Sequence, residues 1–258
     1  MGLLSFNHYV PRDIVDLLLH EKREAVLGLD ETEVTIMFSE LRNFSDVCEG
    51  IDPESVVAHL SDYLDEMMRA VQDTSGLVDK FIGDIVMAFW NAPKRCANHR
   101  GSALRTALEC QDRLVKLQRR WRGSPFAAVK AASSVHSGVC LVGNLGSPDR
   151  LSFTCIGDSV NLTSRLNGLN KVFGTAVITS GQVRDTVRDQ FVTRPLDLVA
   201  VKGKSQVRTY SDASRSLTLV AAGRRVRGAR RCRDVPQPPS RVCRSVRARV
   251  RCVYRAGL

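Results

Sequence analysis

One stretch of fourteen residues, from Phe153 to Leu166, constrains the fold more than any other part of the chain. Its first residues are apolar or β-branched and predict a short strand, while Gly157-Asp158 predicts a turn and the residues that follow predict a helix. Asp158 or Ser159 is the predicted N-cap, because a short side-chain oxygen there accepts from the unpaired amides of the first helical turn. The stretch therefore predicts a strand, turn and helix in succession.

Two polar residues of this predicted helix, Asn161 and Arg165, are four positions apart. This spacing places the amide and the guanidinium on one helix face, one turn above the other. An amide can orient a sugar and a planar guanidinium can bind phosphate, so the pair suits a nucleotide site. On spacing alone, however, an ordinary solvated helix face is the more common explanation of such a pair.

The rest of the chain alternates between strand and helix patterns in the order β-α-β-β-α-β. This order predicts an α+β protein with a ferredoxin-like core, extended at its C-terminal end by further helices and strands. The predicted elements are a helix at 8–20, a strand at 34–38, a helix at 53–71, a hairpin of 77–81 and 85–90, a helix at 100–121, a hairpin of 126–135 and 139–142 around Ser137-Gly138, a loop at 143–150, a strand at 176–179, a helix at 182–189, and strands at 192–201 and 207–210.

The net charge of +11 comes from the C-terminal end alone. Residues 223–258 hold twelve Arg and a single acid, Asp234, whereas residues 1–222 are neutral overall. The folded part thus gives no electrostatic reason to bind nucleic acid, and only the tail can contact an anionic membrane or nucleic acid. The tail lacks helical or strand periodicity and is predicted to be disordered, and it can equally have no function.

The cysteines and the apolar segments bear on the cellular compartment. The eight cysteines show no CxxC spacing, which indicates a reduced protein without a structural zinc site. No apolar run approaches the roughly 18 residues that span a bilayer. Residues 1–9 lack the pattern of a signal peptide. These features predict an intracellular protein, either cytoplasmic or at the membrane periphery.

Two motifs together resemble the signatures of class III nucleotidyl cyclases, the catalytic domain of adenylyl and guanylyl cyclases. One is the stretch from Phe153 to Leu166, and the other is the Val78–Trp90 segment, VDKFIGDIVMAFW. The resemblance runs from about Phe6 to about Asp212 and implies a ferredoxin-like catalytic core. It divides the chain into a helical linker at 1–30, a catalytic domain at 31–213 and an Arg-rich tail at 214–258. In the family, such a linker couples the core to an upstream sensor or regulatory protein.

Two carboxylates, Glu40 at the end of a strand and Asp84 at the tip of a hairpin, are candidate metal ligands. The first and third strands of a ferredoxin-like sheet are neighbours, so both side chains can meet at one end of the sheet. Oxygen ligands suit Mg²⁺ or Mn²⁺, and the resemblance implies two ions per site. Taken singly, each residue is as well explained as a strand-end or turn carboxylate.

Glu40 departs from the family pattern, which has Asp at this position. The extra methylene moves the carboxylate by roughly 1.5 Å, while Mg²⁺ tolerates only tenths of an ångström in its ligand distances. Three outcomes remain open: the site adapts, it prefers the more tolerant Mn²⁺, or it is impaired.

Lys80 and Thr154 match the two positions that read the purine in the family. An ammonium only donates, so it suits N1 of adenine and not the N1–H of guanine. The hydroxyl of Thr154 can accept from the adenine 6-amino group. This combination resembles adenylyl cyclases of the threonine-bearing subgroup. Alternatively, Lys80 is a solvated edge residue and Thr154 a simple β-former.

The remaining site residues also follow from the resemblance. Asn161 is expected to orient the ribose, and Arg165 to stabilise charge on the α-phosphate. Lys202 matches a lysine that binds the terminal phosphates, and the amides of Leu41 to Phe44 are expected to hold the triphosphate at a helix N-terminus.

The sequence thus predicts an adenylate cyclase that converts ATP to 3′,5′-cyclic AMP and pyrophosphate. In the family each site combines carboxylates from one core with Lys, Thr, Asn and Arg from another, so a chain with both sets implies a homodimer. The alternative is a weakened cyclase-like module that binds or regulates, because of Glu40. The activating signal, bicarbonate or calcium for example, is not predicted.

Overall fold

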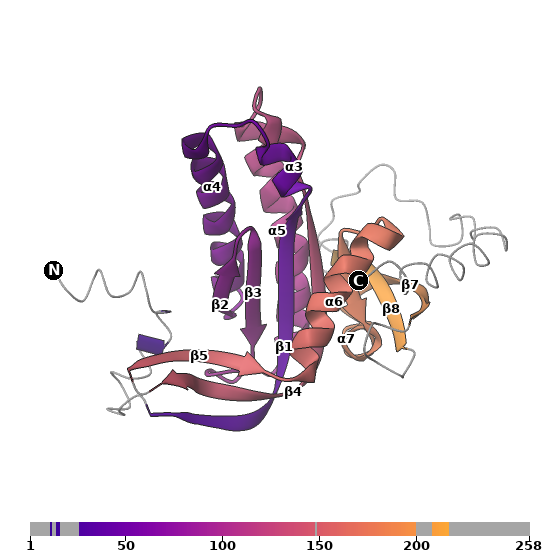
Figure 1. The fold of residues 1–258 in the computed structure, drawn as a ribbon. Coiled ribbons are helices and arrows are strands. Elements are labelled where there is room, and N and C mark those ends of the chain that lie inside the picture. The colour runs from indigo at the N-terminus through magenta and orange to yellow at the C-terminus, as the bar shows by residue number, and fades with distance from the viewer. Residues whose placement is uncertain (1–10, 12–13, 16–25, 148, 200–207, 217–258) are drawn as a thin grey trace, which may run out of the picture.

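The computed structural model describes residues 11, 14–15, 26–147, 149–199 and 208–216, and Figure 1 shows their arrangement. The predicted helix at 8–20, Lys202 and residues 217–258 of the predicted tail lie wholly or largely outside these residues. The elements are β1 (Gly28–Arg42), α3 (Phe44–Cys48), α4 (Pro53–Gln72), β2 (Leu77–Ile82), β3 (Ile85–Trp90), α5 (His99–Arg120), the 3-10 turn η1 (Pro125–Ala128), β4 (Lys130–Ser147), β5 (Arg150–Ile156), α6 (Asp158–Phe173), β6 (Val177–Ser180), α7 (Gly181–Thr186), β7 (Phe191–Val199) and β8 (Arg208–Ser216). Strand β8 thus continues through residues 214–216, which the predicted tail includes.

The strands form one sheet in the order β2-β3-β1-β4-β6-β8-β7, and β5 also pairs with β4. Its first four strands and the helices α4 and α5 make the predicted βαββαβ core, with β1 and β3 adjacent. The elements from β5 to β8 are the C-terminal extension. The predicted α+β, ferredoxin-like class is therefore confirmed.

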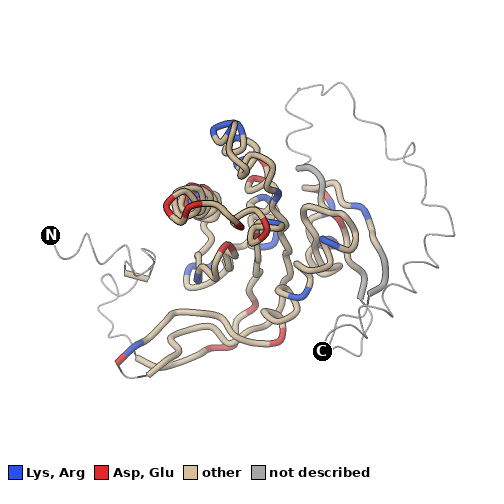
Figure 2. Tube along the Cα trace, turned by 45° about the horizontal axis from the view of Figure 1, so that its top comes forward, with Lys and Arg blue, Asp and Glu red and all other residues tan. Residues whose placement is uncertain are grey.

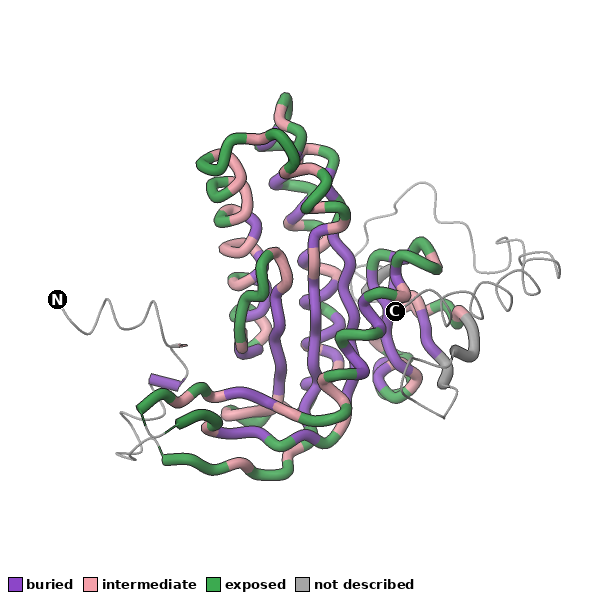
Figure 3. Tube along the Cα trace, in the orientation of Figure 1, coloured by how far each residue is buried: buried purple, intermediate pink, exposed green. Residues whose placement is uncertain are grey.

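Helices α4 and α5 cover one face of this sheet, and α6 packs on the other (Figure 1). The periodic apolar residues of α4 and α5 join the sheet in the largest core cluster, which includes Met67, Leu104 and Trp90. Buried Leu162 and Leu166 of α6 pack instead with Ile178 and Tyr210. Figure 3 shows the central strands buried between these layers.

Strands β1, β4 and β5 continue together as a curved arm beyond the rest of the sheet (Figure 1). In the arm, Gly143 pairs with both Leu29 and Thr154. Its φ is +152°, and a Cβ there would lie 2.2 Å from the carbonyl oxygen of Gly28. Glycine therefore allows a strand conformation that other residues rarely adopt. The arm brings β5 into contact with β2.

The predicted hairpin around Ser137-Gly138 and the predicted loop at 143–150 are wrong. Strand β4 runs unbroken through Ser137-Gly138 and on to Ser147, and the chain turns only between Ser147 and Arg150. Gly138 serves close packing, since a Cβ there would lie 2.3 Å from the Oγ of Ser159 in α6. Glycine in a strand marks such close approach as well as a turn.

The predicted N-cap of α6 is also wrong by one residue. The helix begins at Asp158, its N-cap is Gly157, and no side chain caps it. Ser159 instead donates to the carbonyl oxygen of Val139, 3.4 Å away, and so ties the first turn of α6 to β4. The predicted start of α4 at Pro53 is confirmed, and its N-cap, which was not predicted, is Asp52, whose side chain accepts from the amide of Ser55.

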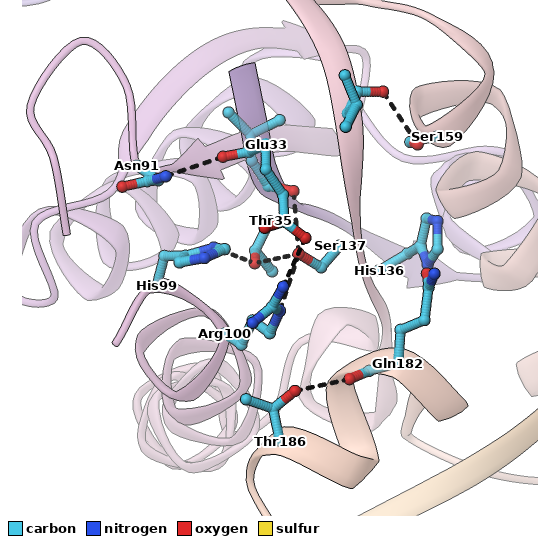
Figure 4. Close-up of polar contacts among 12 residues, drawn as sticks. Glu33, Thr35, Asn91, His99, Arg100, His136, Ser137, Ser159, Gln182 and Thr186 are labelled. Atoms are coloured by element: carbon cyan, nitrogen blue, oxygen red, sulfur yellow. Dashed lines mark hydrogen bonds and ion pairs between the residues drawn. The ribbon is translucent and has the colours of Figure 1, made fainter. Parts of the chain in front are cut away.

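A buried polar network fixes the start of α5 against β1 and β4 (Figure 4). The Nδ1 of His99 lies 2.7 Å from the Oγ1 of Thr35, whose hydroxyl donates to Ser137. Because Thr35 has a single hydroxyl proton, His99 must be the donor to it. Arg100 donates its Nε–H to Ser137 and forms an ion pair with Glu33.

His99 makes the stability depend on pH. Burial, and next the charge of Arg100, lower the pKa of His99 below the usual 6.5, so the folded state binds fewer protons than the unfolded state just below that pH. The contribution of His99 to the free energy of unfolding should be complete above pH 6.5 and be lost progressively as the pH falls below it. Urea unfolding of wild type and His99→Gln between pH 7.5 and 5 measures it. If the free energy of unfolding of the two proteins changes with pH by the same amount, His99 is not the source of the pH dependence.

Candidate active site

The two predicted purine-reading residues, Lys80 of β2 and Thr154 of β5, are in contact. The Nζ of Lys80 donates to the Oγ1 of Thr154 over 3.3 Å, although the residues are 74 positions apart. Thr154 is buried, while the side chain of Lys80 is 46% exposed. The arm described above makes this contact by carrying β5 to β2. Lys80 is thus an edge residue, as the alternative had it, but one that faces Thr154.

A β-bulge in β2 aims Lys80 and adds a third residue, Asp79, to the pair. Val78 pairs with Ala88 and Lys80 with Met87, so Asp79 has no partner on β3. Its carboxylate accepts from the hydroxyl of Thr154 over 2.6 Å and lies 3.1 Å from the Nζ of Lys80. Sequence reasoning missed Asp79. The only signal for it was an acid immediately before the lysine in an otherwise apolar strand.

The two predicted metal ligands lie near one another, at the far end of β1. One oxygen of Asp84, in the turn between β2 and β3, accepts from the backbone amide of Leu41 over 3.0 Å. Glu40 is adjacent to Leu41 and half-buried. Burial first, and the charge of Asp84 after it, raise the pKa of Glu40, while a hydrogen bond from Asn167 and the charge of Arg42 oppose the rise. The end of β1 therefore holds two carboxylates that repel one another.

This carboxylate pair fits a hard divalent cation. Both donors are oxygens, and a cation beside them would offset the burial and the repulsion that raise the pKa of Glu40. Within the described part of the chain, no group of three His, Cys, Asp or Glu side chains lies close enough to hold a metal ion.

Helix α6 presents different amides to the solvent and to the sheet. Asn161 and Arg165 are exposed and one turn apart, as predicted. Asn167 and Asn170 are buried, and Asn170 donates to the carbonyl oxygen of Ser133. Asn167, which the sequence did not single out, binds Glu40. The pair predicted to bind the nucleotide, Asn161 and Arg165, thus faces outward, and a second pair of amides secures α6 to the strands.

The predicted triphosphate cradle lies at the start of α3. Asn43 is its N-cap, with φ of +58°, and Phe44 is half-buried with its ring 6.3 Å from that of Phe126. The role of the amides from Leu41 to Phe44 stays a prediction, as does that of Lys202, which lies outside the described residues.

The family model for the adenylate and guanylate cyclase catalytic domain matches residues 29–211. The chain belongs to this family. The resemblance noted from the two sequence motifs is thereby confirmed.

Named relatives and solved structures agree. Adenylate cyclase 1 of Rhizobium meliloti (strain 1021) is 36% identical over 204 residues, which are 79% of this chain and 31% of that protein. An adenylate cyclase of Anabaena cylindrica is 32% identical over 208 residues, 78% of this chain and 41% of that protein. The chain therefore spans less than half the length of these two relatives.

Solved cyclases of both kinds share the fold. The adenylyl cyclase CyaB from P. aeruginosa superposes with a TM-score of 0.67 at 27% identity, covering 74% of this chain and 97% of that one. The guanylyl cyclase Cya2 superposes with a TM-score of 0.66 at 26% identity, covering 74% of this chain and 95% of that one. The fold does not separate ATP from GTP as substrate, so that question rests on the predicted purine-reading residues. No described helix of the chain is long and apolar enough to cross a membrane.

Substitution of Glu40 should reveal the repulsion between the carboxylates. Glu40→Gln keeps an acceptor for Asn167 and removes a charge that burial and Asp84 disfavour, so without divalent cations we expect it to raise the free energy of unfolding. Chemical denaturation at pH 7 with EDTA measures it. Glu31→Gln, at an exposed position of the same strand, is the control and should change stability by only a few tenths of a kcal/mol. An unchanged or lower stability in Glu40→Gln contradicts the expectation.

Proposed function

We propose that residues 31–213 form an adenylate cyclase that converts ATP to 3′,5′-cyclic AMP and pyrophosphate. The contact between Lys80 and Thr154 carries the proposal, because it joins a donor for adenine N1 to a hydroxyl that can accept from the 6-amino group. In the reaction, the ribose 3′-oxygen attacks the α-phosphorus, the bond to the pyrophosphate oxygen breaks, and the hydroxyl proton is lost.

The chain's other residues have complementary parts in this reaction. Arg165 stabilises the charge that develops on the α-phosphate, and Asn161 orients the ribose. Glu40 and Asp84 are the residues that would hold Mg²⁺ or Mn²⁺, with two ions per site. Bound ions of this kind would lower the pKa of the 3′-hydroxyl and neutralise phosphate charge. The proposal also assigns the terminal phosphates to Lys202 and to the amides near Phe44.

We propose further that each site is shared between two copies of the chain. Asn161 and Arg165 lie on the exposed face of α6, while Glu40 is bound to the buried Asn167 on the opposite side of the same helix. A second copy that supplies carboxylates to the exposed face would complete a site, and two-fold symmetry would make two. Apolar side chains are exposed on the arm and the β2–β3 hairpin, where such a copy could cover them: Phe81, Ile82, Val139, Leu141 and Leu145.

The described surface gives the domain no strong preference for nucleic acid. Acidic and basic residues of the described elements are interspersed, as Figure 2 shows. The substrate of the proposal is accordingly a single nucleotide.

Replacing the exposed arginine of α6 should abolish turnover. We expect Arg165→Ala to lower kcat by about 10²–10³-fold with ATP, because a charge-stabilising donor is lost from the transition state. Cyclic nucleotide production by the purified chain, with ATP or GTP and with Mg²⁺ or Mn²⁺, measures it. Lys171→Ala, at an exposed position of the same helix, is the matched control and should retain the wild-type rate.

Mixing two inactive variants tests whether the sites are shared. Arg165→Ala and Asp84→Asn remove groups from opposite halves of a site, and asparagine still offers an oxygen to the amide of Leu41. After exchange of subunits, half of the dimers would be mixed with one intact site of two, which restores about a quarter of the wild-type rate. No recovery from variants that demonstrably exchange would overturn the shared arrangement and leave the arginine result standing.

The weakened, regulatory module remains the second candidate, favoured by the repulsion at Glu40. For an active enzyme we expect Glu40→Asp to keep the Mn²⁺ rate within about tenfold and to raise the Mg²⁺ rate relative to it, because Mg²⁺ demands stricter ligand geometry. Steady-state assays in each metal measure this ratio. A gain of about 100-fold or more in both metals would instead identify the natural chain as a weakened cyclase.

A further inference from the structure

We propose that Asp79 is a positioning residue that makes the purine pocket selective for adenine over guanine, by fixing the direction in which the Thr154 hydroxyl donates. The inference rests on the proposed cyclase function and concerns how its nucleotide is chosen.

The first support is the bulge. In a regular strand, Asp79 and Lys80 would point to opposite faces of the sheet. The extra residue of a bulge changes this alternation locally and re-aims side chains. Here both neighbours reach the same partner, with Asp79 and Lys80 each in contact with the Oγ1 of Thr154. A backbone irregularity thus assembles three polar groups at one point.

The second support is the burial of the carboxylate. The side chain of Asp79 is 1% exposed, whereas that of Lys80 is 46% exposed. A buried carboxylate only accepts hydrogen bonds and is costly unless it is paired. Asp79 meets this requirement with the hydroxyl of Thr154 at 2.6 Å and the ammonium of Lys80 at 3.1 Å. The hydroxyl proton of Thr154 is therefore committed to Asp79.

Counting donors and acceptors then defines what the pocket can read. Thr154 gives its one proton to Asp79 and accepts from Lys80, which leaves one lone pair for a ligand. Lys80 forms an ion pair with Asp79 and donates one proton to Thr154, so with one proton turned to each partner its ammonium still has one to donate. One acceptor beside one donor complements the 6-amino group and N1 of adenine. Guanine presents O6 and N1–H instead, so both positions mismatch.

A threonine alone would not make this choice. A free hydroxyl rotates and can either accept from a 6-amino group or donate to O6. The selectivity of a pocket with Thr154 therefore depends on the group that takes its proton. An adenylyl cyclase and a guanylyl cyclase of the family resemble this chain almost equally in structure, so the fold does not select the base. The direction of the Thr154 hydroxyl therefore decides the substrate.

The test is Asp79→Asn in the full chain. The Asn amide can donate to Thr154, which frees the hydroxyl proton to face the purine. We expect the ratio of kcat/KM for ATP to that for GTP to fall by about 10–100-fold. Inosine triphosphate, which has O6 and N1–H without the 2-amino group, should show the same shift. Asp112→Asn, an exposed position on α5, is the matched control and should leave the ratio unchanged.

A second substitution separates this role from a structural one. Thr154→Val removes the hydroxyl, so adding Asp79→Asn to it should no longer alter the ratio of ATP to inosine triphosphate. If Asp79 only supports the bulge, the substitution would lower both rates together, or act equally in the Thr154→Val background, and either result overturns the proposal. Should Asp79→Asn fail to fold, Asp79→Ser also removes the carboxylate and is judged by the same ratio.

A binding experiment distinguishes a failure of this inference from a failure of the proposed cyclase function. If wild type forms no cyclic nucleotide, displacement of a fluorescent ATP analogue by ATP or by inosine triphosphate gives the same ratio from dissociation constants. A ratio that falls in Asp79→Asn supports the pocket although turnover is absent. A ratio unaffected by Asp79→Asn, or no displacement by either nucleotide, overturns the inference.

Discussion

The long antiparallel pairing of β1 with β4 is the constraint on which the rest of the structure depends. It pairs residues continuously from Gly28 with Asn144 to Arg42 with Lys130. One end carries Glu40 next to Asp84, and the other carries the arm whose β5 supplies Thr154. Both candidate half-sites are thus attached to one ladder of hydrogen bonds, so their separation is fixed by strand length and not by loops.

The fold was largely predictable from the sequence because its helices and strands carry strong periodic patterns. The limits of α4, for example, follow from its apolar stripe and from Pro53, and a five-residue helix such as α3 carries too little pattern to be read. The error at Ser137-Gly138 has a physical cause, since glycine permits both tight turns and close packing. Only the position of Ser159, fixed by tertiary structure, shows that Gly138 serves packing. A glycine that lets α6 pack this close to β4 therefore has the same local sequence pattern as the turn of a hairpin.

The candidate site was predictable in its parts but less so in its connections. The resemblance supplied Lys80 and Thr154, and the structure brings them into contact. Asp79 was missed because a bulge has no periodic pattern, and a strict alternation would place its side chain away from Lys80. Asn167 was missed because its partner Glu40 is more than a hundred positions away. Contacts of this kind are decided by tertiary packing alone.

The buried Asp79 and the half-buried Glu40 differ in how their charge is balanced. Asp79 has an ammonium and a hydroxyl within hydrogen-bond distance, so its charge is satisfied within the chain. Glu40 faces another carboxylate, and its raised pKa reflects burial and repulsion that Asn167 and Arg42 only partly offset. A satisfied charge is suited to orient its neighbours, whereas an unsatisfied one is suited to receive a cation. An acidic side chain is thus suited to recognition at one end of the sheet and to metal binding at the other, because the surroundings differ.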